Sequence, residues 1–245
     1  QLKGLITEIA SKEHEKGSVA QKIGDLYNLA MDVEKLNADG MNPIKEELDK
    51  IDAIKDKAGI IQAMADLTGS AYFQFYVGAD IMDSKNNIFQ LHQGGIGLGQ
   101  KEYYLEDDEA TKNIREGYKA HIVKMFQLIG QDEKQATKSM EAVMEIETKL
   151  AKKSFSAVEL RNPAANYHML TLDELKKEIA GFDWEAYLNA VGVKGVTSLN
   201  VSQIEPVQEA VAIINTLPLD KQKAYLQWKL VDGAASYLSD AFVAQ

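Results

Sequence analysis

One segment of this chain, Phe73-Gln-Phe-Tyr-Val-Gly-Ala-Asp-Ile81, differs in its pattern from the sequence around it. Apolar or small side chains occupy every second position, and this period of two is typical of a β-strand with one buried face. The polar turn Asp83-Ser-Lys-Asn-Asn87 follows, and then a second stretch, Ile88-Phe-Gln-Leu-His-Gln93. The sequence therefore predicts one small β-hairpin at about residues 73–93.

Outside this hairpin, the apolar residues recur at helical spacing. Val19, Ile23, Leu26, Ala30 and Val33 follow one another at steps of three and four residues, which predicts one long helix that ends at Gly40. Further stripes of this kind lie in the segments 44–67, 114–128, 136–150, 207–214 and 219–238. We therefore expect a mostly α fold, a multi-helix array whose sheet is confined to the hairpin.

Local signals at the helix ends agree with this interpretation. Thr171-Leu-Asp-Glu174 matches a capping box, in which the threonine and glutamate side chains bond reciprocally to the first turn. Asp183 is expected to cap the helix that follows it. Glu106-Asp-Asp-Glu109 precedes a helical stripe, where carboxylates complement the helix dipole. Calcium binding or an acid–base pair is the alternative role for these four carboxylates.

The composition excludes several classes of protein. The chain has 245 residues, no cysteine and a net charge of −10, which excludes disulfide frameworks and thiolate metal sites. The negative charge argues against nucleic acid or an anionic membrane as the main partner. No stretch is apolar for the 18 or so residues that a membrane span needs, so we expect no membrane insertion by this segment. Without a repeat or a linker, residues 1–245 are predicted to form a single unit.

The histidines do not form a recognisable metal motif. None of the four has a second histidine three or four positions away, and there is no His-Glu-x-x-His sequence. His14 lies between two glutamates and is expected on a solvated face, whereas His121 lies among apolar positions and is expected to be a hydrogen-bonded core or boundary residue. His92 and His168 complete the set. We predict no catalytic, cofactor-binding or metal-binding residue in this chain.

The segment Gly94-Gly-Ile-Gly-Leu-Gly99 resembles a phosphate loop only superficially. Its glycine spacing fits neither the dinucleotide fingerprint nor the Walker pattern. We expect these glycines to supply positive φ angles and close backbone approach where the hairpin leads into a helix. Asn200-Val-Ser202 matches a glycosylation sequon, but a single match of this kind usually arises by chance.

The glycine segment also carries a specific resemblance. Gln93-Gly-Gly-Ile-Gly-Leu-Gly-Gln-Lys-Glu-Tyr-Tyr-Leu105 resembles the Gly-Leu-Gly-Leu-Pro-x-(Arg)-Asp-Tyr-Tyr signature of the neprilysin-like zinc metalloendopeptidases. Gly99 stands where the family usually has proline, and the absence of cysteine resembles its bacterial members. Five further segments resemble the family in the same order, namely 80–88, 144–150, 159–172, 182–184 and 225–239. The resemblance thus covers nearly the whole chain.

The resemblance implies a two-lobed parent enzyme that hydrolyses oligopeptides. In this family one lobe binds zinc through His-Glu-x-x-His and a downstream glutamate, and the other lobe is helical and limits access to short peptides. The chain is expected to be that helical lobe, excised from the parent and inactive by itself, with zinc bound outside it. Its expected partners are the catalytic lobe of the same polypeptide and oligopeptide substrates, and its expected location is extracytoplasmic, in the periplasm or cell envelope.

Two alternatives belong to other classes of protein. One is a stand-alone acidic helical binding or scaffold domain without catalysis, and the other is an independent hydrolase whose site is dispersed along the chain. An excised lobe should have a concave face lined by polar groups. It should also have neighbouring termini, and apolar residues left exposed at its ends, in 2–9 and 237–243.

Overall fold

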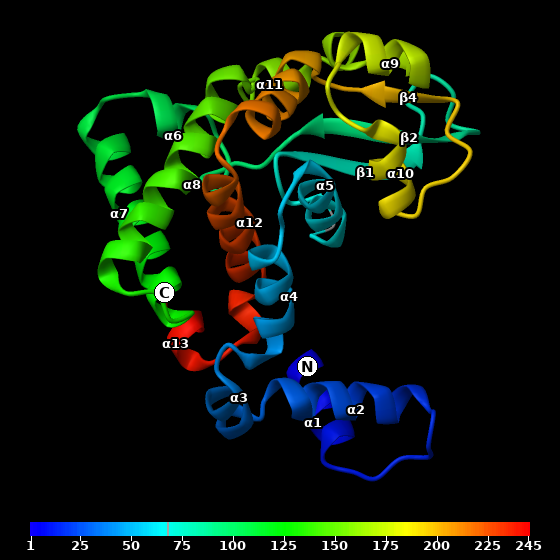
Figure 1. The fold of residues 1–245 in the computed structure, drawn as a ribbon. Coiled ribbons are helices and arrows are strands. Elements are labelled where there is room, and N and C mark those ends of the chain that lie inside the picture. Colours follow the sequence, from blue (N-terminus) through cyan, green and yellow to red (C-terminus); the bar gives the residue numbers. More distant parts are fainter. Residues whose placement is uncertain (68) are drawn as a thin grey trace. The chain divides into compact units, whose positions relative to one another are not determined.

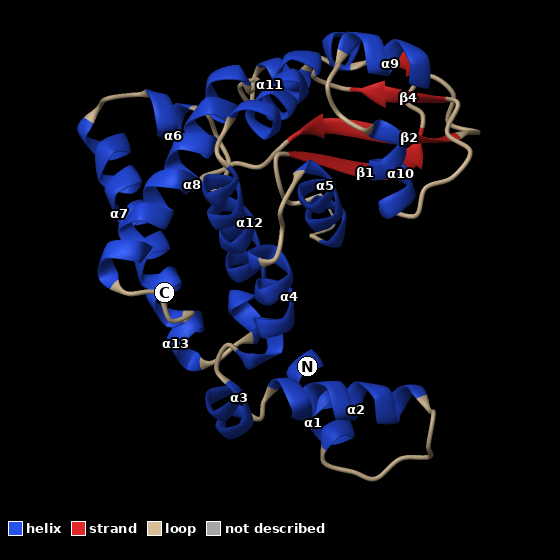
Figure 2. Cartoon of the chain, in the orientation of Figure 1, coloured by secondary structure: helices blue, strands red, loops and turns tan. Residues whose placement is uncertain are grey.

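The computed structural model describes residues 1–67 and 69–245, and the described chain is mostly helical, as predicted (Figures 1 and 2). It divides into two compact units, one formed by Gln1–Lys45 with Gly233–Gln245 and the other by Glu46–Asp232. The boundaries between the units fall within α4 (Asn42–Asp52) and α12 (Leu219–Ala234). The smaller unit also contains α1 (Leu2–Ala10), α2 (Val19–Ala30), α3 (Val33–Asp39), η3 (Ala235–Tyr237) and α13 (Asp240–Val243).

The larger unit holds the remaining elements. Its helices are α5 (Lys57–Asp66), α6 (Glu102–Leu105), α7 (Glu109–Leu128), α8 (Glu133–Lys153), α9 (Leu172–Glu178), α10 (Trp184–Ala190) and α11 (Ile204–Thr216). Its strands are β1 (Phe73–Ala79), β2 (Asn87–Gln93), β3 (Met169–Thr171) and β4 (Ser198–Val201), and two 3₁₀ turns, η1 (Glu159–Arg161) and η2 (Pro163–Asn166), precede β3. The capping box at Thr171 and Glu174 is present at the start of α9, as predicted.

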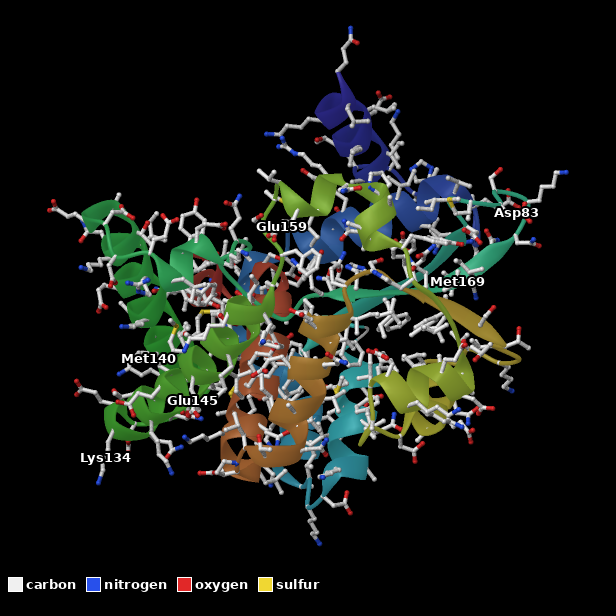
Figure 3. All side chains as sticks on the ribbon, turned by 90° about the horizontal axis from the view of Figure 1, so that it is seen from above. Asp83, Lys134, Met140, Glu145, Glu159 and Met169 are labelled. Atoms are coloured by element: carbon white, nitrogen blue, oxygen red, sulfur yellow. The ribbon has the colours of Figure 1, made fainter. Side chains whose placement is uncertain are left out.

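The predicted hairpin is confirmed. β1 and β2 pair antiparallel from Phe73 opposite Gln93 to Ala79 opposite Asn87, and Asp83 lies at the far end of the hairpin (Figure 3). The sheet extends beyond the hairpin, however, which corrects the expectation that it is confined there. Within the described residues β4 pairs parallel to β2 and β3 pairs antiparallel to β4, in the order β1-β2-β4-β3. Strands of three and four residues are too short to show a period of two.

The two faces of the sheet differ in chemistry, because successive side chains of a strand point to opposite faces. On one face Phe73, Phe89 and Leu91 are buried. The centroid of the Phe73 ring lies 5.3 to 5.8 Å from those of three aromatic rings, Phe182 just before α10 and Trp184 and Tyr187 within it. The other face of the hairpin carries Gln74 opposite His92 and Tyr76 opposite Gln90, so it is polar and aromatic.

The smaller unit departs from the prediction of one long helix before Gly40. α2 ends at Ala30, and α3 begins at Val33 after Asp32, whose carboxylate accepts the N–H of Lys35 at 3.0 Å. Aspartate competes for backbone donors in this way and so starts a new helix. The apolar spacing from Ala30 to Val33 is helical across the break, which is why the pattern does not reveal it.

The chain ends belong to this same smaller unit. The Asn37 side chain donates to the Asp240 carboxylate at 2.9 Å and accepts the Asp240 N–H at 2.9 Å, so α3 is tied to the start of α13. Of the terminal apolar residues, Leu2, Leu5, Tyr237 and Val243 are exposed. Leu238 and Phe242 are buried, so the expected exposure of the ends holds for only part of them.

Candidate functional site

The glycine segment runs from the end of β2 to α6 and is packed against side chains of the core. Gly95 and Gly99 adopt positive φ angles of 82° and 78°. A Cβ atom on Gly95 would lie 2.6 Å from the Tyr225 hydroxyl, and one on Gly97 would lie 1.9 Å from the Tyr118 hydroxyl. Positive φ and close approach are therefore the roles of these glycines, as predicted, and a side chain at Gly97 would force the Tyr118 ring to move.

Two tyrosine hydroxyls hold this segment through its backbone. The Tyr225 hydroxyl donates to the Gly95 carbonyl at 2.7 Å and accepts the Tyr72 N–H at 3.0 Å. The Tyr104 hydroxyl accepts the Leu98 N–H at 2.9 Å and donates to Glu147 at 2.6 Å. Because both hydroxyls donate and accept, each fixes the segment and is itself satisfied.

Glu147 is the centre of this buried network. Its side chain on α8 is fully buried, and its carboxylate accepts hydroxyls from Tyr104 and Tyr118 and lies 3.6 Å from the Lys229 ammonium on α12. Burial raises the pKa of Glu147, while Lys229 and the two tyrosine hydroxyls act in the opposite direction. An enclosed acid with fixed partners is typical of a structural network, and its role here is to hold the glycine segment in place.

A pocket of about 460 Å³ opens on the polar face of the hairpin, beside the glycine segment. We call it the amide pocket, because amide side chains from three separate segments line it. Its lining contains no aspartate, glutamate, lysine or arginine, although the chain as a whole carries a net charge of −10. The lining residues are Gln74, Tyr76, His92, Gln93, Gly94, Gly95, Ile96, Gly99, Ser154, Leu160, Asn166, Ser202 and Gln203.

Hydrogen bonds fix the walls of the amide pocket. Buried Gln203 accepts the Gln93 N–H at 3.0 Å and donates to the Asn166 side chain at 2.5 Å. The Gln93 amide in turn accepts the Phe155 N–H at 2.7 Å and donates to the Phe155 carbonyl at 3.1 Å. Next to this wall, Lys101 lies 3.2 Å from Glu159, a residue labelled in Figure 3. The pocket is therefore preformed.

The aromatic side of the amide pocket is formed by Tyr76 and His92. Their rings meet edge to face at 5.7 Å between centroids, and Tyr76 is 52% exposed. Burial lowers the pKa of His92, which favours a neutral ring. The sequence patterns do not single out this pocket, because Gln203 and Asn166 come from segments that only the tertiary fold brings to β2.

The zinc that the family resemblance implies does not fit the described residues. The histidines are engaged separately: His14 bonds to the Ile9 carbonyl, His168 bonds to the Val201 carbonyl, and His121 packs edge to face on Trp228. The Nδ1 atom of His121 is buried without a hydrogen-bond partner, in contrast to the hydrogen-bonded role expected for it. No group of three or more histidine, aspartate or glutamate side chains in residues 1–67 and 69–245 could hold a metal ion.

Two other candidate motifs have structural roles. Asp108 caps α7 by accepting the Thr111 N–H at 3.0 Å, and Asp107 pairs with Arg115 at 3.2 Å, which supports the helix-end interpretation of the acidic cluster. Asn200 of the sequon is 2% exposed, and its amide donates to Gln90 at 2.8 Å, so it is enclosed in the folded chain. None of the helices that the structure describes combines the length and the apolar character of a membrane span.

Fold and site together define the class of this protein. It is a mostly helical domain that has a preformed polar pocket and, among its described residues, no metal-binding group. The sequence model of the family described as Peptidase family M13 matches residues 1–245. The chain therefore belongs to peptidase family M13, the neprilysin-like zinc metallopeptidases.

Relatives and solved structures agree with this assignment. The chain is 29% identical over 182 residues to endothelin-converting enzyme 1 of Rattus norvegicus, across 71% of this chain and 23% of that protein. It superposes on the zinc metalloprotease Zmp1 of Mycobacterium tuberculosis in its open state with a TM-score of 0.92 and 30% identity, across 100% of this chain and 38% of Zmp1.

A more distant structure supports the fold alone. PepO from Lactobacillus rhamnosis superposes with a TM-score of 0.76 at 16% identity, across 98% of this chain and 39% of PepO. The chain thus spans about a quarter of the length of endothelin-converting enzyme 1 and less than two fifths of Zmp1 and of PepO.

Proposed function

We propose that this chain is the helical substrate-access lobe of a zinc metalloendopeptidase that hydrolyses oligopeptides. One observation carries the proposal: the family model matches all of residues 1–245, yet these residues correspond to only 38% of Zmp1. In the proposed parent enzyme, zinc and the catalytic residues lie outside this chain. The lobe then acts by enclosing the peptide and excluding large substrates, and by itself it is inactive.

The proposed partner of this lobe is the catalytic lobe of the same polypeptide. The support comes from an apolar face on α1 and α2, which pack against each other but bury almost none of their large apolar side chains. Val19 is 73% exposed, Leu26 69% and Leu29 58%. Exposed apolar area of this kind marks an interaction surface, and the termini lie in the same compact unit.

The first test is to read the gene downstream of Gln245. A His-Glu-x-x-His sequence there is the expected result. A stop codon directly after Gln245 would contradict the proposal and favour the scaffold alternative.

The second test is enzymatic. The parent enzyme should cleave short peptides in a zinc-dependent reaction and lose activity as the substrate becomes longer, whereas the 245-residue chain should cleave none of them. Zinc-independent cleavage by the isolated chain would instead favour the independent hydrolase.

The compartment is part of the same proposal. We propose that the parent enzyme acts outside the cytoplasm, in the periplasm or cell envelope, on the basis of its family resemblance. Cell fractionation with an antibody against this chain tests the point, and recovery with the cytoplasmic fraction would contradict it.

A further inference from the structure

We propose that the amide pocket binds an uncharged, extended segment of the peptide substrate through its main chain. This inference rests on the proposed function and names what one face of the lobe would recognise. It draws on the chemistry of the lining, on the rigidity of the walls, and on the aromatic surface of Tyr76 and His92.

The lining matches the chemistry of a peptide main chain. Gln74, Gln93, Asn166 and Gln203 each carry a donor and an acceptor on one planar group, as a peptide unit does. The amides of Gln93, Asn166 and Gln203 already hold the walls, so the Gln74 side chain is the main source of new hydrogen bonds to a ligand. The lining carries no formal charge, and the neighbouring Lys101 and Glu159 are paired with each other, so a charged chain terminus finds no counter-ion in the lining and the pocket favours the interior of a peptide. Its volume of about 460 Å³ lies in the range of small-ligand pockets and is too small for a folded domain.

The walls need no rearrangement before a ligand enters. Gln203 is held from two sides, by the Gln93 N–H and by Asn166, and the glycine segment is held by the buried tyrosines. Gln203 and Ser154 are also at least nine-tenths buried. A preformed site loses less conformational entropy on binding than a mobile one does.

Tyr76 and His92 add a second kind of contact on this face of the hairpin. Their rings meet edge to face in the lining of the pocket, and Tyr76 is more than half exposed. This aromatic surface is available to one substrate side chain.

The test uses the 245-residue chain and the blocked peptide acetyl-Ala-Asn-Phe-Ala-Gln-amide, titrated by isothermal calorimetry with amide chemical shifts recorded in parallel. Wild-type chain should bind it, with shifts at residues 74–76 and 92–95. Gln74→Ala and Tyr76→Ala should each weaken binding about fivefold, the effect of losing one hydrogen bond or aromatic contact. Val77→Ala is the matched control, because Val77 is 55% exposed and lies on the opposite face of the hairpin. This variant should bind the peptide as tightly as the wild-type chain does.

Several outcomes would overturn the inference. They are no binding at millimolar peptide, equal weakening by Val77→Ala, tighter binding of the same peptide with free termini, and tighter binding of the neutral sugar maltotriose. Circular dichroism of each variant excludes a loss of fold as the cause.

The binding measurement involves no catalysis, so it is independent of the tests of the proposed function. If the peptide does not bind, the proposal of an access lobe is unaffected. If no His-Glu-x-x-His is encoded downstream, a peptide site that has been measured in this chain remains valid.

Discussion

Glu147 shows how one residue makes the stability of this chain depend on pH. Its carboxyl is buried, and burial raises its pKa above the ordinary value of 4.5. The folded state therefore binds this proton more tightly than the unfolded state does. The stability linked to that proton is fully present below about pH 4.5 and is lost as the pH rises towards the folded-state pKa.

The variant Glu147→Gln isolates this effect, because glutamine has a similar shape and does not titrate. The free energy of unfolding of wild type minus that of the variant should fall as the pH rises above 4.5 and then level off. Urea unfolding of both proteins across this range measures the difference. A difference that stays constant with pH would contradict the raised pKa.

Gly97 is the residue at which backbone approach matters most. Gly97→Ala places a Cβ atom 1.9 Å from the Tyr118 hydroxyl, so we expect a loss of about 1–3 kcal/mol of stability from overpacking. Gly117→Ala is the control, since its Cβ would have open space on the exposed side of α7, where alanine favours a helix by about 1 kcal/mol. Thermal unfolding should move the two midpoints in opposite directions, and equal shifts would refute the packing argument.

At the scale of helices and strands, the sequence predicts whatever depends on local spacing. α8, α11 and α12 follow from apolar stripes that become largely buried, and the stripe of α7 is buried only in its second half, from Ile122 onward. The hairpin follows from its period of two. The short strand β4 cannot be predicted from local spacing, because its position is set by its pairing with β2. The same reason applies to the amide pocket: the sequence indicates its glycine segment, but Gln203 reaches Asn166 only in the folded chain.

Burial also differs strongly between helices of similar periodicity. α1 buries no residue and α2 buries only Gly24, whereas α8 buries Val143, Ile146, Glu147 and Leu150 among others. Helices with few buried contacts open at low free energy. In the isolated chain we therefore expect amide hydrogens of α1 and α2 to exchange much faster than those of α8, as measured by mass spectrometry. Equal protection would mean that α1 and α2 are stabilised without any partner.

Across the whole molecule, the distribution of histidines makes a prediction about metal. Zinc is held by three or four nitrogen, sulfur or carboxylate ligands that converge on one point, and the ligands must be free to bind it. This chain has no cysteine, and His14 and His168 are each hydrogen-bonded to a separate backbone carbonyl. Exposed carboxylates should then bind zinc only weakly, as any acidic surface does.

Calorimetric titration of the isolated chain with zinc chloride should accordingly show no tight, stoichiometric binding. Binding of one equivalent that disappears in His92→Ala, His121→Ala or His168→Ala would show that these side chains converge after all. It would also overturn the assignment of zinc to a lobe outside residues 1–245. Weak binding that salt abolishes, and that all three variants retain, would agree with a lobe that shapes the substrate cavity and leaves the metal chemistry to its partner.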